Sequence, residues 1–98
     1  MVKNREELLK LLEKHMEEFK KFGVNNLGIF GSFAKGNPGD NSDVDILVEF
    51  QPGKKTFMNF MHLAFYLEGL LERKVELVTP ESLSPYLKPY IMKEVIFI

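Results

Sequence analysis

A chain of 98 residues with a formal net charge of −1 has the length of one small domain, so we expect residues 1–98 to form a single domain. Hydrophobic residues make up 45% of the chain and charged residues 28%, which is the balance of an ordinary globular protein. The near-neutral charge gives no sign of attraction to nucleic acid or to an anionic membrane. The absence of cysteine excludes disulfides and thiolate zinc sites, and no segment resembles a signal peptide or a membrane span, so we expect a cytoplasmic protein.

Hydrophobic periodicity predicts the elements of the first half of the chain. Leucines and phenylalanines at helical spacing predict a helix over residues 5–22. A short strand at 26–30 leads into a glycine-serine pair and a helical turn at 33–36. The loop composition of GNPGDNS, up to residue 42, separates that turn from DVDILVEF at 43–50, which alternates with the period of a strand.

The second half continues the alternation of helices and strands. A helix is predicted over residues 57–72, capped by Thr56, and a strand over 74–78. Pro85 and Pro89 restrict any later helix to short pieces, and the final VIFI is expected to form an edge strand. Helices and strands that alternate with short connections indicate an α/β (α+β) domain, with helices packed on a small sheet.

Two aspartates open the strand at 43–50. Asp43 and Asp45 stand two residues apart, so in a strand they project to the same face. Two adjacent carboxylates repel each other unless a cation lies between them, and Mg²⁺ is the hard ion that accepts such oxygen ligands. A bare Asp-x-Asp pattern is more often a pair of solvated aspartates, so the pair alone is weak evidence.

The turn before them changes this balance. Strand, Gly31-Ser32 and a helical turn direct backbone N–H groups and a hydroxyl toward one point, and helix N-termini attract phosphate. Gly31 would let the backbone approach closely, Ser32 would add a hydroxyl, and Lys35 could supply a cation. An ordinary Gly-Ser turn is the alternative, and it is the commoner one when such a turn occurs without the carboxylates.

Together these segments resemble a known family. Gly-Ser-x-Ala-Lys-Gly, a short loop and Ser-Asp-x-Asp before a hydrophobic run are similar to the signature of the DNA polymerase beta-type nucleotidyltransferases, closest to the minimal nucleotidyltransferases (MNT). The residues on motif positions are Gly31, Ser32, Lys35, Gly36, Ser42, Asp43 and Asp45. The likeness extends over nearly the whole chain and implies a palm-like fold with a small mixed sheet. It also implies that Gly31, Ser32, Lys35 and Ser42 bind the nucleotide, with Lys35 where arginine is usual.

The family carries a third carboxylate, normally aspartate, on a later strand. Glu76 occupies that position here, so the resemblance implies that Asp43, Asp45 and Glu76 are the catalytic and Mg²⁺-binding residues. The glutamate keeps the charge but reaches one methylene further. Asp43 and Asp45 would then hold Mg²⁺ on the phosphates of a nucleoside triphosphate, and Glu76 would accept the proton of the acceptor hydroxyl.

The resemblance also implies a partner. Minimal nucleotidyltransferases are commonly paired with a helical HEPN protein, and some are antitoxins that adenylylate a tyrosine of that partner, which implies ATP and a protein acceptor. A homo-oligomer is a further option. On the predicted second helix, Met58 and Phe65 fall outside the stripe expected to pack on the core, so they would either form an interface or be covered by the sheet. The expected core stripe is Phe57, Phe60, Ala64, Leu67 and Leu71, widened by Leu63 and Leu70.

Two functions of different classes remain open from the sequence. An Mg²⁺-dependent nucleotidyltransferase, acting on a protein partner, is favoured by the Gly31-Ser32 turn and the aspartate pair. A non-catalytic nucleotide-binding module is the alternative, and it is favoured by the departure at Glu76 from the family's aspartate. Transfer to RNA or to an antibiotic is disfavoured, because the chain shows neither a basic patch nor a second domain. His15 and His62 are assigned no catalytic role.

Overall fold

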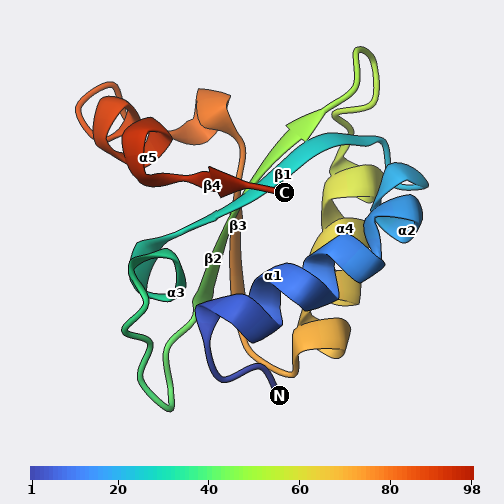
Figure 1. The fold of residues 1–98 in the computed structure, drawn as a ribbon. Coiled ribbons are helices and arrows are strands. Elements are labelled where there is room, and N and C mark those ends of the chain that lie inside the picture. Colours follow the sequence, from blue (N-terminus) through green and yellow to red (C-terminus); the bar gives the residue numbers. More distant parts are fainter.

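The computed structural model describes all of residues 1–98 as four strands and a set of short helices (Figure 1). The α-helices are α1 (Arg5–Lys14), α2 (Met16–Lys20), α3 (Gly31–Lys35), α4 (Phe57–Leu71) and α5 (Lys88–Glu94), and η1 (Pro80–Ser82) is a 3₁₀ turn. The strands are β1 (Val24–Phe30), β2 (Val44–Phe50), β3 (Val75–Val78) and β4 (Ile96–Phe97). No helix combines the length and the apolar character needed to cross a membrane.

The four strands form one mixed sheet in the order β3-β2-β1-β4. β1 pairs antiparallel with both β2 and β4, whereas β2 and β3 run parallel. β4 is an edge strand, as the sequence predicts. Figure 1 shows α1, α2 and α4 on one side of the sheet, α5 on the other, and α3 at the left-hand end of the strands. The small mixed sheet flanked by helices confirms the expected fold class.

The hydrophobic core lies between the sheet and the helices α1, α2 and α4. Strand β2 supplies Val44, Ile46 and Val48 to this core, and all three are fully buried. Because side chains alternate along a strand, the residues between them point to the opposite face of the sheet. Asp45 therefore lies on the face of the sheet that carries α5. The opposite face of the same strand packs in the hydrophobic core, which fixes the position of Asp45.

The predicted first helix is interrupted, which corrects the expected span of residues 5–22. α1 ends at Lys14, and His15 leaves helical geometry with φ −107° and ψ 13°. The His15 Nδ1 lies 3.0 Å from the Leu11 carbonyl oxygen, and the His15 N–H bonds to Leu12 instead. A side chain that hydrogen-bonds a carbonyl of the preceding turn competes with the backbone N–H groups that would bond this carbonyl in a regular helix. After the break, Phe19 on α2 is still fully buried, with its ring against Tyr66.

The packing of α4 also differs in part from the expected stripe. Leu63, Leu67 and Leu71 are fully buried, but Phe57 is 74% exposed. At about 100° per residue, Phe57 lies about 80° from the centre of the buried stripe and in the first turn of the helix. Met58 and Phe65 point almost directly away from that stripe and are 57% and 63% exposed. The sheet therefore does not cover them.

Candidate active site

The glycine turn and the aspartate pair meet at one end of the sheet. β1 ends at Phe30, which pairs with Asp45 on β2, so the next residue, Gly31, reaches the Asp45 side chain. A Cβ on Gly31 would collide with Asp45 Oδ2 and lie 3.0 Å from Cγ. Gly31 also has φ +71°, a conformation that side chains disfavour. Glycine is needed here for its backbone angle and for this close approach.

Glu76 lies beside Asp45 on the neighbouring strand. The parallel register of β2 and β3 pairs Asp45 with Glu76, so the two carboxyl groups stand at neighbouring positions on adjacent strands. Burial raises the pKa of Asp45 from 3.8 to about 7, with further contributions from the neighbouring carboxylates of Glu76, Asp43 and Glu94. The structure therefore brings the third predicted carboxylate against the second, and the longer glutamate reaches it.

Asp43 lies at the start of β2 and remains exposed. Its charge contributes to the raised pKa of Asp45, so it belongs to the same acidic cluster. Asp43 also lines a polar concavity of about 200 Å³ beside Ser42, Arg73 and Lys74.

The donor set of this cluster suits Mg²⁺ in its chemistry. No group of three or more His, Cys, Asp or Glu side chains is placed so that it could hold a metal ion by itself, and this includes the predicted set of Asp43, Asp45 and Glu76. Mg²⁺ does not require one, because it commonly binds through one or two carboxylates and completes its shell with water and substrate phosphates. Asp45, destabilised as an anion by burial and by three neighbouring acids, is the kind of carboxylate that a divalent cation stabilises.

The Gly31-Ser32 turn contains a contact that sequence reasoning missed. The Gly31 N–H donates to Glu94 Oε1 at 3.2 Å, and Glu94 Oε2 lies 3.8 Å from Lys35 Nζ. Phe30 precedes α3 and has no side chain that can cap it, so Glu94 supplies the cap from α5. No local signal could have revealed this contact, because 63 residues separate its partners.

The other predicted nucleotide-binding residues surround the same turn. Ser32 is half-buried on α3, and Lys35 is exposed at the end of that helix. The Ser42 hydroxyl accepts the Gly39 N–H at 2.7 Å, so in this structure it closes the turn that precedes Asp43.

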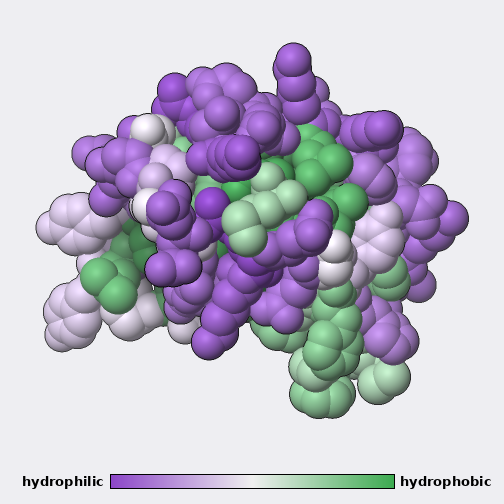
Figure 2. Space-filling view, turned by 90° about the horizontal axis from the view of Figure 1, so that it is seen from below, coloured by the Kyte–Doolittle hydropathy of each residue, from purple (hydrophilic) through white to green (hydrophobic).

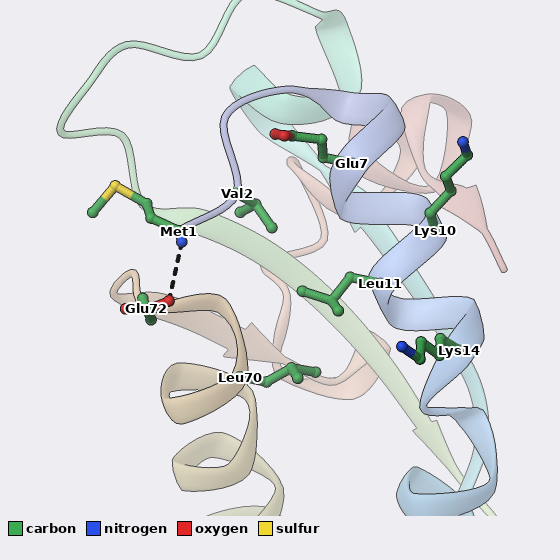
Figure 3. A pocket seen from close by; sticks show the side chains of 8 residues that line it. All are labelled: Met1, Val2, Glu7, Lys10, Leu11, Lys14, Leu70 and Glu72. Atoms are coloured by element: carbon green, nitrogen blue, oxygen red, sulfur yellow. Dashed lines mark hydrogen bonds and ion pairs between the residues drawn. The ribbon is translucent and has the colours of Figure 1, made fainter.

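Asp43 lines the concavity of about 200 Å³, but the rest of the cluster lies outside the hollows of the surface. None of the four concavities of the molecule contains Gly31, Asp45 or Glu76. Figure 3 shows the concavity between α1 and α4, of about 430 Å³, where Leu11 and Leu70 face each other and the Met1 amino group pairs with Glu72. It combines an apolar floor with exposed charges and is separate from the carboxylates.

Comparison with known proteins decides the family. The model of a family described as "nucleotidyltransferase domain" matches residues 9–98. The chain belongs to this family. It is 37% identical over 94 residues to the protein adenylyltransferase MntA of Thermococcus cleftensis, and the match covers 95% of this chain and 94% of that protein.

Solved structures agree with this assignment. A structure assigned as a minimal nucleotidyltransferase superposes with a TM-score of 0.83 at 32% identity, covering 96% of this chain and 95% of that one. A toxin–antitoxin crystal structure with AMP-PNP matches with a TM-score of 0.66 at 25% identity, over 97% of this chain and 72% of that one. The predicted family, fold and enzyme class are confirmed, and the roles of individual site residues stay predictions.

A substitution at Gly31 tests how closely the turn and the carboxylate depend on each other. Gly31→Ala is expected to lower the thermal midpoint and to weaken Mg²⁺-dependent ATP binding at least about tenfold, because the new Cβ displaces Asp45. Gly53→Ala is the matched control, since Gly53 has φ +77° but no atom lies within 4 Å of the place that a Cβ there would occupy. Both variants lose about 1–2 kcal/mol to the backbone angle. Calorimetric ATP affinities that fall equally in the two variants would contradict the contact with Asp45.

Proposed function

We propose that this nucleotidyltransferase transfers an adenylyl group from ATP, in the presence of Mg²⁺, to a hydroxyl of a partner protein. The observation that supports it best is the contact of the Gly31 turn with Asp45, which pairs with Glu76 on the neighbouring strand. A phosphate-binding turn, a metal-binding carboxylate and a proton acceptor are the parts that phosphoryl transfer needs. The 37% identity to a protein adenylyltransferase supports ATP and a protein acceptor.

The proposed roles follow from where each residue lies. Asp43 and Asp45 hold Mg²⁺, which when bound neutralises charge on the phosphate oxygens. Ser32 and Lys35, on α3, contact the distal phosphates, and the Gly31 N–H joins them when the Glu94 carboxylate moves off it. Ser42 keeps Asp43 in place through the turn it closes. With these contacts the side chains orient the triphosphate over the open face of the sheet.

Glu76 is the proposed proton acceptor. The oxygen of the acceptor hydroxyl forms a bond to the α-phosphorus of ATP, the bond from that phosphorus to the pyrophosphate oxygen breaks, and the hydroxyl proton passes to Glu76. The strand register supports this role, because it places the Glu76 carboxyl beside Asp45, the proposed metal ligand. Pyrophosphate leaves with the electron pair of the broken bond.

A helical partner protein of the HEPN type would supply the acceptor. The site is open, and α4 exposes three large apolar side chains, Phe57, Met58 and Phe65. Figure 2 shows hydrophobic surface gathered on the side of the molecule where α4 lies. The similarity to a toxin–antitoxin structure supports an antitoxin role for the chain. A homo-oligomer and a cytoplasmic location stay predictions.

Incubation with α-labelled ATP, Mg²⁺ and the protein encoded beside this chain in its genome tests the proposal. We expect label on that partner, released with one pyrophosphate per transfer, and none when EDTA replaces Mg²⁺. A parallel reaction with γ-labelled ATP separates adenylyl transfer from phosphorylation. ATP binding without label on the partner would favour the alternative, a nucleotide-binding module that acts without catalysis.

A further inference from the structure

Arg73, in the short connection between α4 and β3, binds the backbone of two distant segments. Its Nε donates to the Val2 carbonyl at 2.8 Å. Its Nη1 lies within hydrogen-bond distance of three carbonyl oxygens in the loop before β2, at 3.3 Å from Gly39, 3.0 Å from Asp40 and 3.0 Å from Ser42. The Arg73 guanidinium therefore lies within hydrogen-bond distance of three backbone carbonyls of the loop that precedes Asp43.

The same guanidinium also contacts α3, the helix that follows the Gly31 turn. Its carbon lies 5.0 Å from the centre of the Phe33 ring, a cation–π distance. Phe33 belongs to α3 and is fully buried in the core. Arg73 thus connects the loop to the helix that carries Ser32 and Lys35, so the two halves of the site share one anchor.

The loop has few other contacts that could fix its position. Between Gly39 and Ser42 its own bonds are the Gly39 N–H to the Ser42 hydroxyl and the Ser42 N–H to the Gly39 carbonyl, at 2.7 and 3.3 Å. Asp40, Asn41 and Asp43 are exposed. Asp43 follows directly on the Ser42 carbonyl that Arg73 binds.

On its other side, Asp43 precedes a firmly held residue. The Val44 N–H donates to the Lys74 carbonyl at 2.9 Å, which fixes the start of β2 against the residue after Arg73. The backbone of Asp43 is therefore held from both sides by the Arg73-Lys74 pair. Lysine at position 73 could not do the same, because a single ammonium lacks the planar fork that reaches Val2 and the loop together.

We propose that Arg73 is a positioning residue that holds Asp43 where the metal–nucleotide complex needs it. The expected effect on Mg²⁺ binding rests on the proposed function. The anchoring of the loop by Arg73 does not depend on that function. Residues that orient metal ligands typically change metal affinity ten- to a hundredfold when they are removed. The Ser42 hydroxyl bonds the Gly39 N–H within the loop, and Arg73 is the side chain that bonds the loop from outside it.

Hydrogen exchange in the metal-free protein tests the anchor alone. Arg73→Met is expected to increase amide exchange over residues 37–43 about tenfold or more, and Arg73→Lys to give an intermediate increase. Arg5→Met is the matched control, because Arg5 also donates to a backbone carbonyl, that of Ala34 at 2.9 Å, but does not contact the loop. If the loop exchanges as slowly in Arg73→Met as in Arg5→Met, the anchor does not exist.

The Mg²⁺ concentration that gives half-maximal ATP binding tests the consequence. We expect it to rise about tenfold in Arg73→Met, to rise less in Arg73→Lys, and to stay at the wild-type value in Arg5→Met. A purely structural Arg73 would lower the thermal midpoint and leave this Mg²⁺ requirement unchanged, which would overturn the proposal. A wild-type protein that binds no ATP at any Mg²⁺ concentration would count against the proposed function instead, and the exchange rates would still test the anchor.

Discussion

The Asp43→Asn/Asp45→Asn double variant is expected to lose Mg²⁺-dependent ATP binding and to lower adenylyl transfer by about a thousandfold or more. Both substitutions remove an anionic oxygen from the proposed metal site and preserve the size of the side chain. Asp40→Asn is the matched control, because Asp40 lies exposed on the loop just before the site. Wild-type ATP affinity in the double variant would remove these aspartates from the metal site.

The same double variant is expected to be more stable than the wild type when no metal is present. The pKa of Asp45 is raised to about 7 by burial and by its acidic neighbours, so the folded protein disfavours the ionised form. Well below about pH 4 the Asp45 carboxyl is protonated in both the folded and the unfolded state, so it does not change the free energy of unfolding. Between about pH 4 and 7 Asp45 ionises in the unfolded chain but not in the folded protein, so the free energy of unfolding falls as the pH rises. Above about pH 7 the carboxyl is ionised in both states, and the folded protein keeps the full loss of stability.

Thermal unfolding in EDTA at several pH values measures this effect. The thermal midpoint of the double variant should exceed that of the wild type by a few degrees at pH 8, and the difference should shrink toward pH 4. A lower midpoint than the wild type at pH 8 would mean that the acidic cluster stabilises the metal-free fold, contrary to the raised pKa of Asp45.

Glu76→Gln is expected to lower adenylyl transfer by about 10²–10⁴-fold while ATP binding stays close to the wild-type value. Binding depends mainly on the two aspartates and the phosphate turn, whereas the transfer step needs a group that accepts the hydroxyl proton. Glu49→Gln is the matched control, since Glu49 lies on the same face of β2 as Asp45 but at the other end of the strand. Undiminished transfer in Glu76→Gln would leave Glu76 without a role in the reaction.

Glu76→Asp separates the enzyme from the non-catalytic alternative. An enzyme adapted to glutamate should lose about a hundredfold in transfer, because the shortened carboxylate stops about 1 Å from its place. If the chain is instead a degenerate nucleotide-binding module, the wild-type protein should show no adenylyl transfer, and Glu76→Asp should gain it because the family's aspartate is restored. Transfer assays on the wild type, Glu76→Gln and Glu76→Asp at matched ATP and Mg²⁺ distinguish the two.

Carboxyl NMR provides a measurement on Glu76 that does not depend on turnover. The neighbouring carboxylate of Glu76 raises the pKa of Asp45. The pKa of Asp45 should therefore fall in Glu76→Gln and remain raised in Glu49→Gln. An unchanged titration of Asp45 in Glu76→Gln would mean that the two side chains do not interact in solution.

Local sequence determined most of the elements and the core of the site. The alternation in DVDILVEF predicts the strand and the face on which Asp45 lies, because side-chain direction in a strand depends only on position along it. The observed strand begins at Val44, so Asp43 lies one residue before it. The Gly31-Ser32 pair predicts a sharp turn into a helix, which α3 confirms. The Thr56 cap and the start of α4 at Phe57 are also confirmed.

Only the tertiary structure decided what surrounds these residues. Glu94 caps the Gly31 turn from 63 residues away, and Arg73 binds the Ser42 carbonyl from 31 residues away. Sequence periodicity records which face of an element is apolar, but contacts between distant segments depend on how the elements are placed against each other in three dimensions. Residues such as Arg73 and Glu94, which act through backbone groups of other elements, therefore carry no local pattern that marks them.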